Sequence, residues 1–145
     1  MLKFTLELNA ASKALLEKDK IAFRAGMRKG LIDAMYFLEA AVKKSFGTSG
    51  KPKVRTGALR RSIQGRVVNN TEGRIGSNLI YAPVMEFGAL IKARRAKYLT
   101  FKVDGQWRKV KQVTIPARPF FYPTIEENVQ KVGNIILNRI EEAIK

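Results

Sequence analysis

With no histidine in the chain, carboxylates are the first side chains to consider as acids or bases, and their spacing argues against catalysis. Two adjacent pairs occur, Glu126–Glu127 and Glu141–Glu142. Neighbouring helical residues point in different directions, so the two members of a pair cannot act on one substrate. The favourable interaction of negative charge with a helix N-terminus is enough to explain Glu126 and Glu127.

Metal and nucleophile chemistry also lacks its usual residues. A magnesium nuclease needs two or three convergent carboxylates, whereas residues 51–118 offer only Glu72, Glu86 and Asp104. The chain has no histidine and no cysteine, which removes the commonest general base, thiolate ligands and every Ser-His or Cys-His mechanism. No phosphate-loop or dinucleotide glycine pattern is present. We expect no catalytic residue, no metal and no cofactor.

Basic residues dominate the charge and are concentrated in the middle of the chain. There are 28 Lys and Arg against 12 Asp and Glu, a formal net charge of +16. Residues 51–118 hold sixteen basic and three acidic residues, a net charge of +13, whereas residues 119–145 hold three and four, a net charge of −1. Such a field favours contact with a polyanion or an acidic protein surface.

Two basic clusters fall in predicted loops or at the ends of elements, where side chains can reach phosphates. No aromatic platform is interleaved with them, so any DNA contact would be with the backbone and blind to sequence. An acidic protein partner, or plain solvated charge on loops, is the alternative. The candidate DNA-facing residues are Lys51, Lys53, Arg55, Arg60 and Arg61 (with Arg66 beside them) in the first cluster, and Lys92, Arg94, Arg95 and Lys97 in the second.

The elements that must position these residues follow from apolar periodicity. Alternation over residues 2–8 predicts a strand, residues 9–12 open a helical stretch, and a long helix follows over 19–46 with Gly26 and Gly30 marking a bend or close packing. The apolar face of this helix comprises Ile21, Leu31, Met35, Leu38, Val42 and Phe46. A short helical turn is expected within 56–63, strands over 63–68 and 74–77, and one or two helical turns over 81–88.

Two further strands, 98–103 and 107–115, flank Asp104-Gly105, a hairpin signal. The proline-rich connector 115–127 should be stiff and extended. Thr124, with Glu127 three residues on, has the capping-box spacing for a final helix over about 125–144. The core-facing stripe of this helix comprises Ile125, Val129, Val132, Ile136, Ile140 and Ala143.

These elements predict an α+β fold in which one antiparallel sheet of hairpins packs against a long N-terminal and a long C-terminal helix. At 145 residues we expect one domain, with mobile loops at about 47–56 and 90–97. The longest apolar run, 79–85, is too short to span a bilayer, and the start lacks an apolar signal core. We expect a soluble protein without membrane contact, and the lack of cysteine suits a reducing cytoplasm.

Three segments taken in order resemble one family. They are Arg55-Thr-Gly-Ala-Leu-Arg-Arg-Ser-Ile63, Gly76-Ser-Asn-Leu-Ile-Tyr-Ala-Pro-Val-Met-Glu-Phe-Gly88 and Ile115-Pro-Ala-Arg-Pro-Phe-Phe-Tyr-Pro123. Together with the flanking helices they resemble the small tail-component proteins of long-tailed phages and prophages, which act as neck, head–tail joining or tail-completion proteins. The basic insert 92–97 departs from the pattern and blurs the place in the neck or tail.

This resemblance implies a non-enzymatic virion protein, made in the bacterial host cytoplasm, that assembles into a ring between capsid portal and tail. It implies as partners other copies of the chain, connector and tail-tube proteins, and double-stranded DNA in transient, non-specific contact. Within the motifs, an ion pair between Glu86 and Arg118 with aromatic residues beside it is one interpretation; a junction that only caps the core is the other. The candidate interface or junction residues are Tyr81, Glu86, Phe87, Arg118 and Phe120.

Two other classes of function stay open. Charge alone supports a free, sequence-nonspecific nucleic-acid-binding protein. A histidine-free ribonuclease could use Arg94, Arg95, Lys97 and Tyr98, which lie close together in the sequence.

Overall fold

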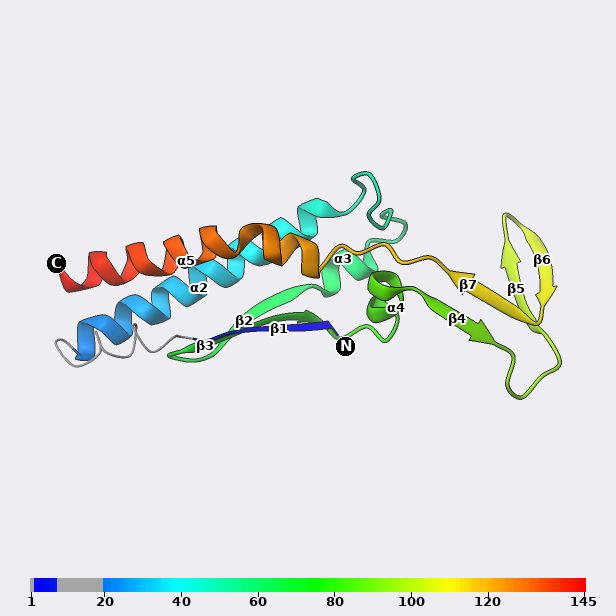
Figure 1. Cartoon of the computed structure of the whole chain (residues 1–145), viewed down its shortest axis with the longest axis horizontal. Helices are drawn as coiled ribbons and strands as arrows, with labels where there is room; N and C mark the ends of the chain where they lie inside the picture. Colours follow the sequence, from blue (N-terminus) through cyan, green and yellow to red (C-terminus); the bar gives the residue numbers. More distant parts are fainter. Residues whose placement is uncertain (1, 8–19) are drawn as a thin grey trace.

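The computed structural model describes residues 2–7 and 20–145. Figure 1 shows a body in which two long helices lie over a sheet, and an arm of paired strands that extends from one end. The predicted helical stretch opening at 9–12 lies outside the described residues. In chain order the elements are β1 (Leu2–Glu7), α2 (Lys20–Ser45), α3 (Ala58–Ser62), β2 (Gln64–Asn69), β3 (Glu72–Ser77), α4 (Ala82–Phe87), β4 (Ala89–Lys92), β5 (Leu99–Val103), β6 (Gln106–Val110), β7 (Gln112–Ile115) and α5 (Tyr122–Ile144).

Helices α2 and α5 lie side by side, and glycines allow their backbones to approach closely (Figure 1). A Cβ on Gly26 would lie 2.7 Å from the carbonyl oxygen of Arg139, and one on Gly30 would lie 2.8 Å from the Cα of Ile136. The predicted close packing at these glycines is confirmed. At the surface, Arg139 Nε lies 2.6 Å from a carboxylate oxygen of Asp33 and joins the two helices.

The apolar faces of both helices are confirmed with one exception each. Ile21 is 86% exposed and Val129 is 47% exposed, so neither belongs to the core. Ile21 precedes the first core residue of α2, Phe23, and Val129 lies on a stretch of α5 whose buried residues resume only at Val132. The predicted face residues that are buried are Leu31, Met35, Leu38, Val42 and Phe46 on the α2 side, and Ile125, Val132, Ile136 and Ile140 on α5.

A three-stranded antiparallel sheet, in the order β1-β3-β2, lies on the other side of α2. The predicted hairpin of β2 and β3 is confirmed. Two glycines of the sheet face α2: a Cβ on Gly65 would lie 2.9 Å from the carbonyl oxygen of Met35, and one on Gly73 would lie 2.9 Å from its Sδ. Helix α2 is therefore the middle layer, between the sheet and α5.

The remaining strands do not join this sheet, so the prediction of one sheet is wrong. β4 pairs with β7, and β5 pairs with β6, as two separate two-stranded sheets. The predicted strand over 107–115 divides at Lys111, because β6 closes the Asp104-Gly105 hairpin while β7 pairs with β4. This pairing sets Ile91 opposite Val113 and gathers apolar side chains on one face. Residues 90–92, predicted as part of a mobile loop, thus belong to a strand. Residues 89–115 are called the arm below.

Residues 46–57 contain neither helix nor strand, as predicted for 47–56. None of the helices in the described residues has the length and apolar character needed to cross a membrane.

Candidate functional site

The three motif segments meet where the connector 116–121 enters α5, and Glu86 of α4 organises this junction. Its carboxylate accepts three backbone N–H hydrogen bonds: Oε2 from Phe120 and Phe121 at 2.8 and 2.9 Å, and Oε1 from Tyr122 at 3.0 Å. Glu86 is 2% exposed. A carboxylate at a helix N-terminus satisfies donors that have no partner within the helix, and it interacts favourably with the helix dipole.

Glu86 therefore caps the N-terminus of α5, the role that the sequence spacing predicted for Thr124. Helix α5 begins at Tyr122, and its N-cap residue, Phe121, makes no side-chain capping bond. Thr124 lies inside the first turn, buried, and its hydroxyl donates to the carbonyl of Phe120 at 2.7 Å. The predicted capping box of Thr124 and Glu127 is wrong, because α5 begins two residues earlier, at Tyr122, and the Glu86 carboxylate accepts from the N–H groups of Phe120, Phe121 and Tyr122 at that start.

The proposed ion pair between Glu86 and Arg118 is not formed within the subunit. Among the described residues, no salt bridge joins the two side chains, and Arg118 is exposed. The carboxylate is already occupied by three N–H donors. Arg118 contributes through its backbone instead, since its N–H donates to the carbonyl of Met85 at 2.8 Å and ties the connector to α4.

The aromatic residues of the motifs divide between the inside and the surface. Phe120 is fully buried, with its ring centroid 4.8 Å from that of Phe46. Phe87 and Tyr81, at the two ends of α4, are 65% and 45% exposed. Ile80, which the sequence reading missed, is 93% exposed, although its place in the apolar run 79–85 was the available signal. The junction thus caps the core and also presents apolar side chains to solvent.

The first basic cluster surrounds a hollow beside α3. Lys51 is half-buried, whereas Lys53, Arg55, Arg60 and Arg61 are exposed. The hollow has a volume of about 350 Å³ and is lined by both apolar and basic residues. The apolar and aromatic lining includes Phe46, Leu59, Tyr81 and Met85, and the basic lining includes Lys53, Arg55 and Arg60.

The second basic cluster lies on the arm, far from the first (Figure 1). Lys92 ends β4, while Arg94, Arg95 and Lys97 lie in the segment between β4 and β5, and all four are exposed. The Lys97 ammonium lies 5.7 Å from the ring centre of Tyr98. The fold therefore does not bring the two predicted clusters together into one surface.

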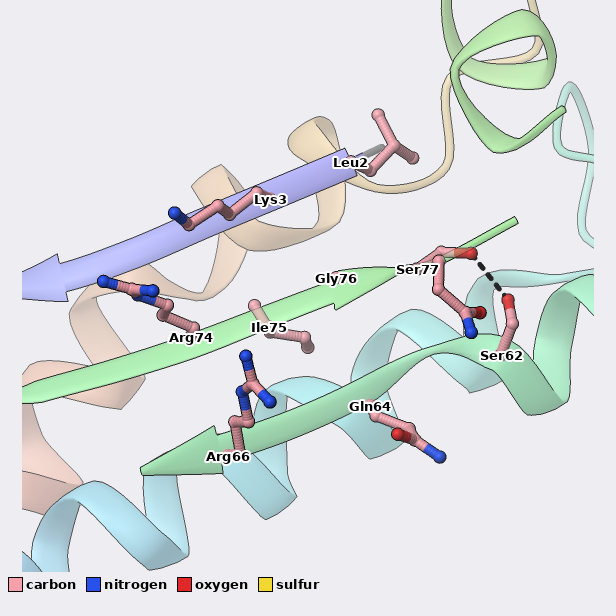
Figure 2. Close-up of a pocket in the computed structure, with 10 residues that line it drawn as sticks. Leu2, Lys3, Ser62, Gln64, Arg66, Arg74, Ile75, Gly76 and Ser77 are labelled. Atoms are coloured by element: carbon pink, nitrogen blue, oxygen red, sulfur yellow. Dashed lines mark hydrogen bonds between the residues drawn. The ribbon is translucent and has the colours of Figure 1, made fainter. Parts of the chain in front are cut away.

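A third basic group is formed on the solvent face of the three-stranded sheet. The sequence placed one of its members, Arg66, beside the first cluster and did not predict its grouping with Lys3 and Arg74. Figure 2 shows Lys3 of β1, Arg74 of β3 and Arg66 of β2 following one another across the sheet. They border a hollow of about 470 Å³. Alternation along the three strands was the signal, but only the pairing register shows that these cations are neighbours.

The described residues contain no group of three or more His, Cys, Asp or Glu able to hold a metal. One carboxylate with a perturbed pKa has a structural setting: burial raises the pKa of Glu39, but hydrogen bonds from Lys43 at 2.6 Å and from the Gly65 N–H at 2.8 Å outweigh this and lower it. Glu39 thereby fastens α2 to β2.

Comparison of the chain with protein-family models, with curated proteins and with solved structures gives no match.

Proposed function

We propose that this chain is a structural subunit of the head–tail connector or tail-completion region of a long-tailed phage or prophage. It assembles into an oligomeric ring that joins the capsid portal to the tail, and DNA passes through it. Its place is the virion, after synthesis in the bacterial cytoplasm. Other copies of the chain and the adjoining connector and tail-tube proteins are its partners, and it has no enzymatic role.

The observation that carries this proposal is the arm, whose strands have unpaired edges and whose apolar side chains are exposed in the single subunit. An isolated two-stranded ribbon is marginally stable in water, and its unpaired edges offer backbone groups to another chain. Several of its apolar side chains are exposed: Leu90 by 52%, Ile91 by 41%, Val103 by 43% and Trp107 by 71%. Such an arm gains stability when a partner covers it.

A closed ring needs two different, complementary surfaces on each subunit. The arm is one, with eight basic residues against one acidic residue in 89–115, a net charge of +7. The complement on the neighbouring copy is the start of α5, where Glu126 and Glu127 are exposed. Phe87 also lies there, 65% exposed and with its ring centroid 5.8 Å from that of Tyr122. Apolar and acidic groups together match the apolar and basic arm.

Light scattering of the purified chain at low and moderate salt tests the proposal. We expect a discrete species of roughly six to twelve subunits, as closed symmetry requires a fixed number. Trp107→Ala should shift this species toward monomer. Tyr36→Ala is the matched control, because Tyr36 is an exposed aromatic (68%) on α2, away from the arm. A chain that stays monomeric at all concentrations and forms no cross-linked oligomer contradicts the proposal, as does assembly equally sensitive to both substitutions.

A free, sequence-nonspecific nucleic-acid-binding protein is the second candidate, favoured by the net charge of +16 and by the exposure of both predicted clusters. Tight, salt-sensitive binding of duplex DNA by a monomer would select it. For the ribonuclease alternative, RNA cleavage that is abolished by Arg95→Ala and Tyr98→Phe is the required result.

A further inference from the structure

The solvent face of the three-stranded sheet concentrates positive charge in a fixed arrangement. Strand pairing sets Arg66 directly opposite Arg74 and sets Lys3 opposite Gly76. The opposite face of the sheet packs on α2, so these three side chains have no part in the core. Figure 2 shows them on the exposed side, where β1, β3 and β2 each contribute one.

Among the described side chains this charge is only partly balanced. Like charges directly opposite each other on paired strands are destabilising. Arg74 has an ion pair with Glu72, at 2.5 Å, but in residues 2–7 and 20–145 neither Lys3 nor Arg66 makes one. Two arginines therefore lie side by side on this face, and only one of them, Arg74, is paired with a carboxylate of a described residue. The remaining positive charge is suited to binding an anionic ligand.

The shape of this face fits a backbone better than a base. Gly76 lies between Lys3 and Gln64 in the register, and a Cβ there would lie 2.2 Å from the carbonyl oxygen of Leu2, so the centre carries no side chain. The resulting hollow of about 470 Å³ has basic and polar residues at its border and no aromatic residue in its lining. Stacking of single-stranded bases is therefore not supported.

We propose that the outer face of the sheet, through Lys3, Arg66 and Arg74, binds the phosphate backbone of duplex DNA and so faces the lumen of the ring. This inference rests on the proposed function and specifies which surface lines the channel. An acidic protein fits less well, because stable protein interfaces have an apolar centre and Val68, at 44%, is the exposed large apolar residue among the described residues of the three strands. Contacts to phosphates alone are blind to sequence, as passage of a whole genome requires.

Fluorescence anisotropy with a labelled duplex of mixed sequence, over a range of salt, tests the inference in the full chain. The double variant Arg66→Gln, Arg74→Gln should bind roughly 10- to 100-fold more weakly at about 0.1 M salt, and the slope of log K against log salt should fall by about 2. Arg66→Lys, Arg74→Lys should retain most of the affinity, because it keeps both charges.

The matched control is Arg24→Gln, Arg28→Gln, which also removes two positive charges, but from exposed positions of α2. It should bind within about threefold of the unmodified chain, since only a general effect of net charge remains. Circular dichroism and thermal melting of each variant identify any loss of fold. If the double glutamine variant unfolds, the single variants Arg66→Gln and Arg74→Gln carry the test, each with an expected fall in the salt slope of about 1.

Three results overturn the inference: no duplex binding at low salt, equal loss of affinity in both glutamine variants, or equally tight binding of polyglutamate, which would indicate a general anion surface. Light scattering on the same samples separates this from the proposed function. A ring that forms while the sheet variant binds DNA normally removes only the inference, whereas a chain that never oligomerises removes the ring itself.

Discussion

The junction and the arm differ in whether their backbone polar groups and apolar side chains find partners within the subunit. At the junction, the N–H groups at the start of α5 are bonded to the buried Glu86 carboxylate, and Phe120 and Phe121 are fully buried. In the arm, each strand pairs on one edge and Trp107 is 71% exposed. The difference is that the described body satisfies these groups within the subunit, whereas the arm leaves them for the assembly that we propose.

The largest effect should come from breaking the junction. Glu86→Ala leaves three N–H groups at the start of α5 without their acceptor, and buried unsatisfied donors cost about 1–3 kcal/mol each, so we expect a loss of at least about 3 kcal/mol in the free energy of unfolding. Urea denaturation measures it. Arg118→Ala removes an exposed side chain from the same junction and should change stability by less than about 0.5 kcal/mol. Equal losses of unfolding free energy in Glu86→Ala and Arg118→Ala would indicate that an ion pair between these two side chains organises the junction.

A smaller loss is expected where the body is packed most tightly. Gly30→Ala places a methyl group 2.8 Å from the Ile136 Cα and should destabilise the chain by about 1–3 kcal/mol, because overpacking forces α2 and α5 apart. Gly133→Ala, on α5, meets no atom within 4 Å and should stabilise it by up to about 1 kcal/mol through helix propensity. Thermal melting of both variants checks the contrast, and destabilisation by Gly133→Ala would show that this face of α5 is covered.

The arm should contribute almost nothing to the stability of the free subunit. Trp107→Ala, which we expect to weaken assembly, should change the unfolding free energy of the monomer by less than about 0.5 kcal/mol, as is usual for exposed positions. Chemical denaturation under dissociating conditions gives this value. A loss near that of Glu86→Ala would mean that the arm belongs to the core.

A further small effect concerns pH and the contact of α2 with β2. The folded-state pKa of Glu39 is lowered by Lys43 and the Gly65 N–H, so the unfolded chain binds its proton more readily. The contribution of Glu39 is therefore complete above the unfolded pKa of about 4.3 and is lost as pH falls through the lower folded value. Glu39→Gln should flatten this part of the stability profile by less than about 1 kcal/mol. Carboxyl groups titrate between roughly pH 5 and pH 3. If Glu39→Gln left the pH dependence of the unfolding free energy unchanged over this range, Glu39 would not contribute to that dependence.

Local sequence patterns predicted the helices and strands, whereas contacts between segments far apart in the sequence determine how these elements are capped and paired. The span of α2, the hairpin of β2 and β3 and the Asp104-Gly105 turn, with φ of 49° and 82°, follow from periodicity and turn chemistry. The cap of α5 could not be predicted from spacing, because Glu86 reaches it from 34 residues away in sequence, as counted to Phe120. Likewise, the pairing of β4 with β7 depends on the intervening hairpin closing on itself.

The same distinction applies to the candidate site. The motifs did not show which of their side chains are buried: Glu86 and Phe120 lie inside, and Tyr81, Phe87 and Arg118 lie at the surface. The basic group on the sheet was hidden in sequence, because Lys3, Arg66 and Arg74 are brought together only by strand register.

Amide hydrogen exchange on the free and the assembled chain tests the central claim most directly, since exchange rates report local opening. In the free subunit, the amides of Phe120, Phe121 and Tyr122 should be protected, and those of β4 and β7 should exchange rapidly. On assembly, only the arm amides should gain protection, by roughly tenfold or more for each 1.4 kcal/mol of added stability. Arm amides that are as protected in the monomer as those of the junction, or that stay unprotected in the assembled ring, would contradict the account.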